Sequence, residues 1–218
     1  MKDGLIRHKV YDRLRADILS CTLSPGQEFR EGDLAKRFGV SKSPIRDALQ
    51  RLELEGLVEI EPRRGHRVAP ISVADAEDIL GLREVLEAGA VRIIVSNASD
   101  ETLADLDRLR KADTSDLKAF AAYNRDFHQA ICGATDNRRL AASAAGLMEA
   151  YDRLCIVSLS STGLPEVMSM TEALADHNAI IDALQARNAT AAVRASSKHV
   201  KKSRQSIMRG LQARPIVA

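Results

Sequence analysis

A glycine between two apolar helical patterns constrains the fold of residues 29–56 more than any other feature of this chain. An apolar side at residues 34–38 predicts a short helix that stops at Gly39, a residue suited to the left-handed conformation common at helix ends. A second helix is expected next, because Ser41 is a good N-cap and apolar residues then recur at helical spacing. Those residues are Ile45, Ala48, Leu49 and Leu52. The pattern predicts two helices packed across a tight turn.

The flanking sequence adds a further helix and a hairpin. Apolar residues at every fourth position in the segment 10–18 predict an earlier helix. Residues 57–60 and 66–69 suit two short strands, and residues 62–65, which include proline and glycine, suit the turn between them. We therefore expect a three-helix core with a basic β-hairpin, which is a winged helix-turn-helix, over residues 1–72.

The outward face of the second helix is polar and basic near its start. A recognition helix presents such side chains to the major groove, and a basic hairpin tip, here including Arg64, suits phosphate or a minor groove. The alternative is that this charged face is only solvated. We interpret the region as a reader of double-stranded DNA. The helix residues expected to contact DNA are Lys42, Ser43, Arg46 and Gln50.

Charge and composition divide the chain in the same way. Residues 1–72 hold 14 Lys and Arg against 11 Asp and Glu, and the remainder holds 18 against 19, so the excess positive charge lies in the N-terminal region. Aromatic residues make up only 3% of the chain, and Ala, Leu and Ile dominate after residue 72. This composition favours helices packed on helices, with strands confined to the hairpin.

The cysteines and the N-terminus indicate the compartment. Cys21, Cys132 and Cys155 show no C-x-x-C spacing and need no pairing in a reducing cytosol, so we expect them to be buried small residues. The N-terminus lacks the apolar core of a signal peptide, and no run approaches the roughly 18 apolar residues of a membrane span. We expect a protein of the cytoplasm with no membrane partner.

From Val73 onward the apolar pattern is helical almost throughout. Polar residues, glycines and a proline divide it into about six helices, so we expect an antiparallel all-α bundle over residues 73–218. The expected fold class is mainly α, in two domains. The expected helices span residues 73–96, 100–111, 116–133, 137–157, 166–187 and 189–211.

Three of the five histidines fall in this bundle, one on each of three expected helices. His177 lies 11 residues before Asn188 and His199 lies 11 residues after it. In an antiparallel hairpin that turns at Asn188, equal distances from the turn put both side chains at the same height. Asn124 and His128 are four residues apart, so both project from one face of their helix. Packing that face against the hairpin would bring three imidazoles and an amide oxygen together.

Such a cluster is typical of a metal site with open coordination positions. Neutral imidazoles bind borderline divalent metals, and an incomplete protein shell leaves room for water or a ligand's carboxylate. We expect zinc first, with nickel and manganese as alternatives. Three other readings stay open: isolated histidines, a regulator for which the ion itself is the signal, and a metal-dependent hydrolase. The expected metal ligands are Asn124, His128, His177 and His199.

Residues 34–58, LAKRFGVSKSPIRDALQRLELEGLV, resemble the GntR family of bacterial transcription regulators without a gap. Members of that family commonly have arginine where this chain has Lys42. Lysine is a point donor without the planar fork that reads guanine through two hydrogen bonds. The resemblance implies DNA contacts from Ser41, Lys42, Ser43 and Arg46, and from the wing near Gly65 and His66.

The bundle resembles the FCD ligand-binding domain of the FadR-type branch of that family. In many members an aspartate stands at the place of Asn124 and joins three histidines as metal ligands, which implies the same site here. Asparagine is neutral, so the resemblance implies weaker metal binding. About six helices after the wing resemble the shorter VanR-like subgroup. The matching segments are residues 127–131, 176–184 and 198–199.

Arg83, on the first bundle helix, is expected to bind the carboxylate of an effector. A guanidinium fork takes two oxygens at once, and the family resemblance implies the same role. The alternative is an exposed salt bridge with Glu87, four residues on. Arg153, Ser158 and Ser160 are further candidates for the same pocket.

These features together predict a homodimeric, effector-responsive regulator of transcription. A small organic acid at the metal centre would repack the bundle and change the setting of the two DNA-reading domains. Half-site spacing is a rigid geometric requirement, so DNA affinity would change. By family resemblance, the expected action is that of a repressor released from a near-palindromic operator.

Overall fold

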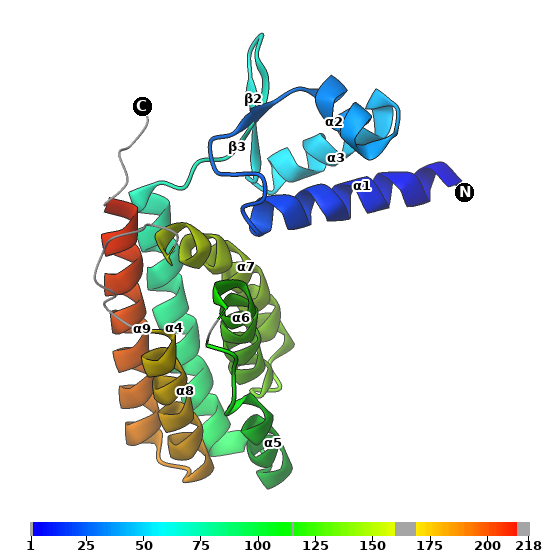
Figure 1. Cartoon of the computed structure of the whole chain (residues 1–218). Coiled ribbons are helices and arrows are strands. Elements are labelled where there is room, and N and C mark those ends of the chain that lie inside the picture. The colour runs from blue at the N-terminus through cyan, green and yellow to red at the C-terminus, as the bar shows by residue number, and fades with distance from the viewer. Residues whose placement is uncertain (1, 115, 160–168, 213–218) are drawn as a thin grey trace. The chain divides into compact units, whose positions relative to one another are not determined.

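The structure is a computed structural model that describes residues 2–114, 116–159 and 169–212 (Figure 1). The chain divides into two compact units, Met1–Ile71 and Ser72–Ala218, and each has a hydrophobic core of its own. Helices dominate the described residues, so the expectation of a mainly α fold is confirmed.

The N-terminal unit is a winged helix-turn-helix. Its elements are α1 (Lys2–Leu19), β1 (Glu28–Phe29), α2 (Glu31–Phe38), α3 (Lys42–Leu54), β2 (Val58–Glu61) and β3 (Gly65–Val68). Leu14, Ile45 and Leu52 are fully buried in the core of this unit. Gly39 has a left-handed conformation, with φ 64°, that ends α2, and Ser41 occupies the N-cap position of α3. The predicted pair of helices across a tight turn is confirmed.

The strands form one antiparallel sheet in the order β1-β3-β2. The expectation that strands are confined to the hairpin was wrong, because the two residues of β1, which precede α2, also pair with β3. Gly65 begins β3 with φ 117°, and a β-carbon there would lie 2.7 Å from the backbone oxygen of Phe29. Only glycine therefore allows β1 to approach the wing so closely.

The C-terminal unit is a helical bundle. Its elements are α4 (Val73–Asn97), α5 (Asp100–Asp105), the 3₁₀ turn η1 (Leu106–Leu109), α6 (Leu117–Gly133), α7 (Arg138–Leu159), α8 (Met170–Gln185) and α9 (Ala189–Gln212). The helix expected at 100–111 was too long, because its second half is a 3₁₀ turn. The expected start at residue 166 lies outside the described residues, and the helix is seen from Met170, after a capping box formed by Ser169 and Glu172.

Five of the described helices pack against one another in the bundle (Figure 1). α4 lies along α9, α8 folds back onto α9, and α6 packs against α7. The hairpin between α8 and α9 turns at Asn188, whose side-chain oxygen accepts a hydrogen bond from the N–H of Ala191. Ile94, Phe127 and Ile180 belong to the core that joins α4, α6 and α8. This packing directs residues from three distant segments toward one interior region.

The structure also bears on the cysteines and on membranes. Cys132 and Cys155 are buried as expected, whereas Cys21 is half-buried. The expectation was wrong for Cys21 because this residue forms the turn after α1 in a left-handed conformation, with φ 54°. Among the described residues, no helix combines the length and the apolar character that a membrane span requires.

Candidate metal centre and DNA-reading surface

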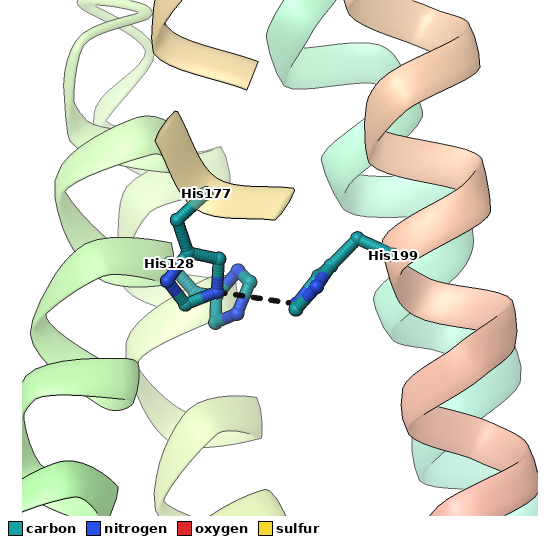
Figure 2. Close-up of side chains that lie close together, drawn as sticks. All are labelled: His128, His177 and His199. Atoms are coloured by element: carbon teal, nitrogen blue, oxygen red, sulfur yellow. Dashed lines mark hydrogen bonds between the residues drawn. The ribbon is translucent and has the colours of Figure 1, made fainter. Parts of the chain in front are cut away.

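Three histidines from three helices meet inside the C-terminal unit (Figure 2). His128 lies on α6, His177 on α8 and His199 on α9, and each is at most 1% exposed. One ring nitrogen from each lies within 4.8 Å of the other two. The Nε2 atoms of His177 and His199 are 3.2 Å apart (Figure 2). Two ligand nitrogens on a tetrahedral zinc ion would lie roughly 3.3 Å apart, so this pair has the spacing of metal ligands.

His177 is held in position by two aromatic neighbours. Its ring stacks on Phe127 at a centroid distance of 3.8 Å and an interplanar angle of 8°. The hydroxyl of Tyr123 lies 3.0 Å from Nδ1 of His177 and donates to the backbone oxygen of Leu109 at 2.9 Å. Because the hydroxyl proton is already used, the hydroxyl oxygen accepts from Nδ1–H of His177. Nε2 of His177 therefore carries a lone pair that points at His199.

His199 shows why the centre suits a cation. If the two Nε2 atoms share a hydrogen bond, the proton must sit on Nε2 of His199, because Nε2 of His177 has none. Nδ1 of His199 then has no hydrogen-bond partner among the described residues, with Asp176 Oδ2 3.8 Å away. If His199 held a metal ion through Nε2, its ring proton would reside on Nδ1, which faces the Asp176 carboxylate. The orphaned nitrogen and the acidic neighbour thus fit a divalent ion.

His128 is held by a buried ion pair of α4. Its Nδ1 lies 2.9 Å from Oε1 of Glu87, so Nδ1 carries the proton and donates to that carboxylate. Its Nε2 therefore accepts from the guanidinium of Arg83, whose Nη2 lies 2.8 Å away. The lone pair that a metal would need on His128 is engaged by a cation of the protein.

Arg83 is fully buried. The alternative of an exposed salt bridge with Glu87 was therefore wrong, because the pair is not exposed. The salt bridge exists at 2.6 Å, but Glu87 is only 4% exposed and Arg83 is 0% exposed. The guanidinium lies 4.2 Å from the centre of the Tyr151 ring. Nη1 of Arg83 has no hydrogen-bond partner in the part of the chain that the structure describes. A desolvated guanidinium with an unused donor is suited to an anion.

Burial keeps the imidazoles of the cluster neutral. Loss of solvent and the positive charge of Arg83 lower the pKa of His128 to about 3. Burial and the neighbouring imidazoles lower the pKa of His177 well below its ordinary value, and burial lowers the pKa of His199. Although burial opposes its ionisation, Arg83 holds the pKa of the Glu87 carboxyl far below its usual range. Neutral imidazole is the form that ligates metals.

The other expected residues of this site are placed differently. Asn124 is buried one helical turn before His128 on α6. Arg153 is buried on α7, but it is two residues from Tyr151, and residues two apart on a helix do not share a face. The Ser158 hydroxyl donates to the backbone oxygen of Ser206, seven residues beyond His199 on α9. Ser160 lies outside the described residues.

Three partners of the histidines were not predicted from the sequence. Glu87 was considered only as a partner of Arg83, although it also contacts His128. Tyr123 sets the tautomer of His177, and Asp176 faces His199 from the neighbouring helix. The four-residue spacing of Arg83 and Glu87 on α4 was a local signal for an ion pair. No local signal connected Tyr123 with α8.

The side chains expected to read DNA lie on the surface of the N-terminal unit. Of these, the side chains on α3 and at its N-cap are all exposed, and Arg64 is exposed at the tip of the wing; the former are Ser41, Lys42, Ser43, Arg46 and Gln50. Gly65 and His66 are half-buried, and the His66 ring stacks on Phe29 with a centroid distance of 6.0 Å. These residues lie on α3, directly before it, and on the wing of the same unit.

Two of these cations are paired with acidic residues. Arg46 makes two hydrogen bonds to Glu31, at 3.1 and 3.0 Å, and Arg64 lies 3.5 Å from Glu28. The Glu31 carboxylate accordingly raises the pKa of Arg46, and Arg46 lowers the pKa of Glu31. DNA phosphate would have to compete with Glu31 for Arg46.

Comparison with known proteins decides the family. Residues 6–68 match the model for bacterial regulatory proteins of the gntR family, and residues 78–202 match the FCD domain. This chain belongs to the GntR family. It is a transcriptional regulator with a DNA-binding winged helix-turn-helix and an FCD domain, a kind of domain that takes small-molecule effectors and often binds metal.

Similar proteins agree with this GntR assignment. The regulator is 28% identical over 207 residues to the HTH-type transcriptional repressor RspR of Escherichia coli strain K12, covering 93% of this chain and 89% of that protein. It is 30% identical over 184 residues to an HTH-type transcriptional regulator of Streptomyces ambofaciens, covering 82% and 75%. The solved structure of E. coli McbR/YncC, 20% identical, shares the fold with a TM-score of 0.74 over 95% of this chain and 97% of that one.

Proposed function

We propose that this GntR regulator is a homodimeric repressor whose affinity for a near-palindromic operator is controlled by a small carboxylate bound at a metal ion. The observation that carries the proposal is the pair of Nε2 atoms, 3.2 Å apart, on histidines whose other nitrogens face Tyr123 and Asp176. His128, His177 and His199 would hold the ion, zinc first and nickel or manganese as alternatives, with Asn124 as a further ligand. The metal, when bound, supplies a positive centre for the acid.

The effector class is argued from the charges around the cluster. Arg83 is a buried cation with an unused donor, and it lies within hydrogen-bond distance of His128. A carboxylate can bind a metal through one oxygen and a guanidinium through the other. A cation would be repelled by Arg83 and the metal, and a neutral sugar would not compensate their positive charge. Arg153 stays a prediction as a second contact to the acid.

The DNA-reading role is proposed for the exposed start of α3 and for the wing. Lys42 and Arg46 would contact phosphate or bases, with Ser41, Ser43 and Gln50 beside them in the major groove. The wing would contact the DNA backbone or the minor groove through Arg64, Gly65 and His66. These side chains are accessible, apart from the half-buried Gly65 and His66.

The dimer is proposed from symmetry and from an apolar patch. A near-palindromic operator requires two reading heads related by a twofold axis. Leu82 and Val85, three residues apart on α4, are 50% and 69% exposed, and large apolar side chains close together on a surface favour contact with a partner. A second copy of the chain is the proposed partner at this face.

Metal titration and operator binding test the proposal together. The full chain, stripped with a chelator, is expected to bind one zinc ion per protomer, and His177→Phe, which preserves the stacking on Phe127, should lose at least 100-fold in affinity. His8→Phe, in the other unit, is the matched control. A wild-type chain that binds zinc no better than His177→Phe would contradict the metal centre.

The second half of the experiment tests whether the signal is the organic acid or the metal ion itself. DNA selected by the wild-type protein from random duplexes would be titrated with metal-loaded protein across a panel of small carboxylates. One class of acid is expected to weaken binding at least tenfold in the wild type and not in His177→Phe. Release of DNA by chelation alone, with no acid active, would instead identify a metal sensor.

A further inference from the structure

Arg83 occupies the position that a metal ion would need at His128. The Nη2 donor lies 2.8 Å from Nε2 of His128, while Glu87 holds the Nδ1–H of the same ring at 2.9 Å. The Glu87 contact fixes the tautomer, so Nε2 is the only nitrogen of this ring with a lone pair that a metal or a donor can use. Arg83 and a metal therefore compete for one atom.

We propose that Arg83 is a gate that couples metal binding to anion binding. When His128 binds the metal, the guanidinium is displaced from Nε2 and becomes the binding group for a carboxylate; when no metal is bound, it returns to the ring. The inference rests on the proposed metal centre. It adds that Arg83 weakens metal binding unless an anion is present.

The surroundings of Arg83 explain why displacement needs an anion. The side chain is 0% exposed, so a displaced guanidinium cannot find water. Glu87 accepts from Nε of Arg83, and the Tyr151 ring covers one face of the guanidinium, which leaves Nη1 without an acceptor among the described residues. Losing His128 would leave a second buried donor group unsatisfied, which is costly. A ligand carboxylate supplies two acceptor oxygens.

Linkage then makes the two ligands cooperative. If an anion satisfies the displaced guanidinium, it removes part of the cost of metal binding, so it raises metal affinity. By the same thermodynamic cycle, the metal raises anion affinity by an equal factor. Arg83 thus prevents the centre from responding strongly to either ligand alone.

A zinc competition titration with a chromophoric chelator tests the gate. Arg83→Met alone would leave Glu87 as an uncompensated buried charge, which attracts zinc for another reason, so both members of the ion pair are replaced and the double variant is compared with the wild type. Arg83→Met/Glu87→Gln is expected to bind zinc about tenfold more tightly than the wild type, since a hydrogen bond from a charged donor no longer has to be broken. Equal or weaker binding in a folded double variant would overturn the gate.

A control ion pair and a titration with acetate complete the design. Arg125 and Asp152 are paired at 2.7 Å between α6 and α7, with Asp152 buried and Arg125 half-buried, and Arg125→Met/Asp152→Asn should leave zinc affinity unchanged. Sodium acetate is expected to tighten zinc binding in the wild type at least fivefold more than in Arg83→Met/Glu87→Gln. The same acetate effect in both proteins would also overturn the proposal.

This outcome is distinct from failure of the metal centre itself. If neither the wild type nor Arg83→Met/Glu87→Gln binds zinc more tightly than His177→Phe, the proposed metal site and the gate both fail. If the wild type binds zinc through His177 but the Arg83 variant gains nothing, only the gate fails. Melting curves of each variant show whether the fold is intact.

Discussion

The two units of this regulator use charged side chains in opposite ways. In the winged unit, the side chains proposed to read DNA are mostly exposed, and Arg46 pairs with Glu31 where water can replace either partner. In the helical unit, Arg83, Glu87 and three histidines are withdrawn from water and depend on one another. Exposed ion pairs contribute little to stability, whereas a buried group that loses its partner is costly. Binding at the surface can therefore be tuned without affecting the fold, but binding in the core is tied to folding.

The largest expected difference between the two units is in their response to pH: acid should destabilise the helical unit. The three buried imidazoles have pKa values below the unfolded value, so the unfolded chain binds more protons below about pH 6.5, and stability is lost as the pH falls. Each ring contributes at most about 1.4 kcal/mol per pH unit, or roughly 4 kcal/mol for three. Asp152 opposes this below pH 6, because burial raises the pKa of its carboxyl to about 6 and the folded state keeps that proton.

The net loss is expected to be at most about 3 kcal/mol per pH unit between pH 6 and pH 5 in the metal-free helical unit. Denaturant unfolding of the full chain at pH 7.5, 6 and 5, followed by the fluorescence of its tyrosines, measures it. His177→Phe should reduce the slope by about 1.4 kcal/mol per pH unit, whereas His8→Phe should not. Identical slopes for wild type and His177→Phe would mean that His177 is not held neutral.

A smaller effect is expected at Gly65, and it should stay within the winged unit. Gly65→Ala places a β-carbon 2.7 Å from the Phe29 oxygen at a φ of 117°, which should cost about 2–3 kcal/mol of stability. The winged unit should melt at a lower temperature while zinc affinity is unchanged. Gly81→Ala is the matched control, because Gly81 lies inside α4 with open space around it, and alanine there should stabilise by up to about 1 kcal/mol. A parallel loss of zinc affinity in Gly65→Ala would show that the units are not independent.

The smallest change in stability is expected at Arg46. Arg46→Ala removes an exposed pair with Glu31, so the unfolding free energy should change by less than about 1 kcal/mol. Affinity for selected DNA should fall about tenfold, and the slope of affinity against salt should decrease by about one ion if Arg46 contacts phosphate. Arg108→Ala, at an exposed arginine of η1, should leave both unchanged. Loss of stability equal to the loss of affinity would contradict a surface role.

Local periodicity determined most of the architecture. The apolar spacing of Ile45 to Leu52, the left-handed glycine at 39 and the six helical segments after residue 72 all lie within single elements, where sequence and structure are coupled directly. Even the meeting of His177 with His199 followed from counting residues on either side of Asn188. Each of these features depends on backbone geometry that repeats along the chain.

The tertiary structure decided the rest. Whether Arg83 would be exposed or buried depends on α4 packing against α6 and α7, and the contact of Glu87 with His128 spans 41 residues of chain. Tyr123 reaches His177 over 54 residues, and β1 joins the wing only because Gly65 admits a close backbone. Sequence alone fixes which faces of a helix are apolar. It does not fix which two faces meet, because that choice depends on the packing of all the helices at once.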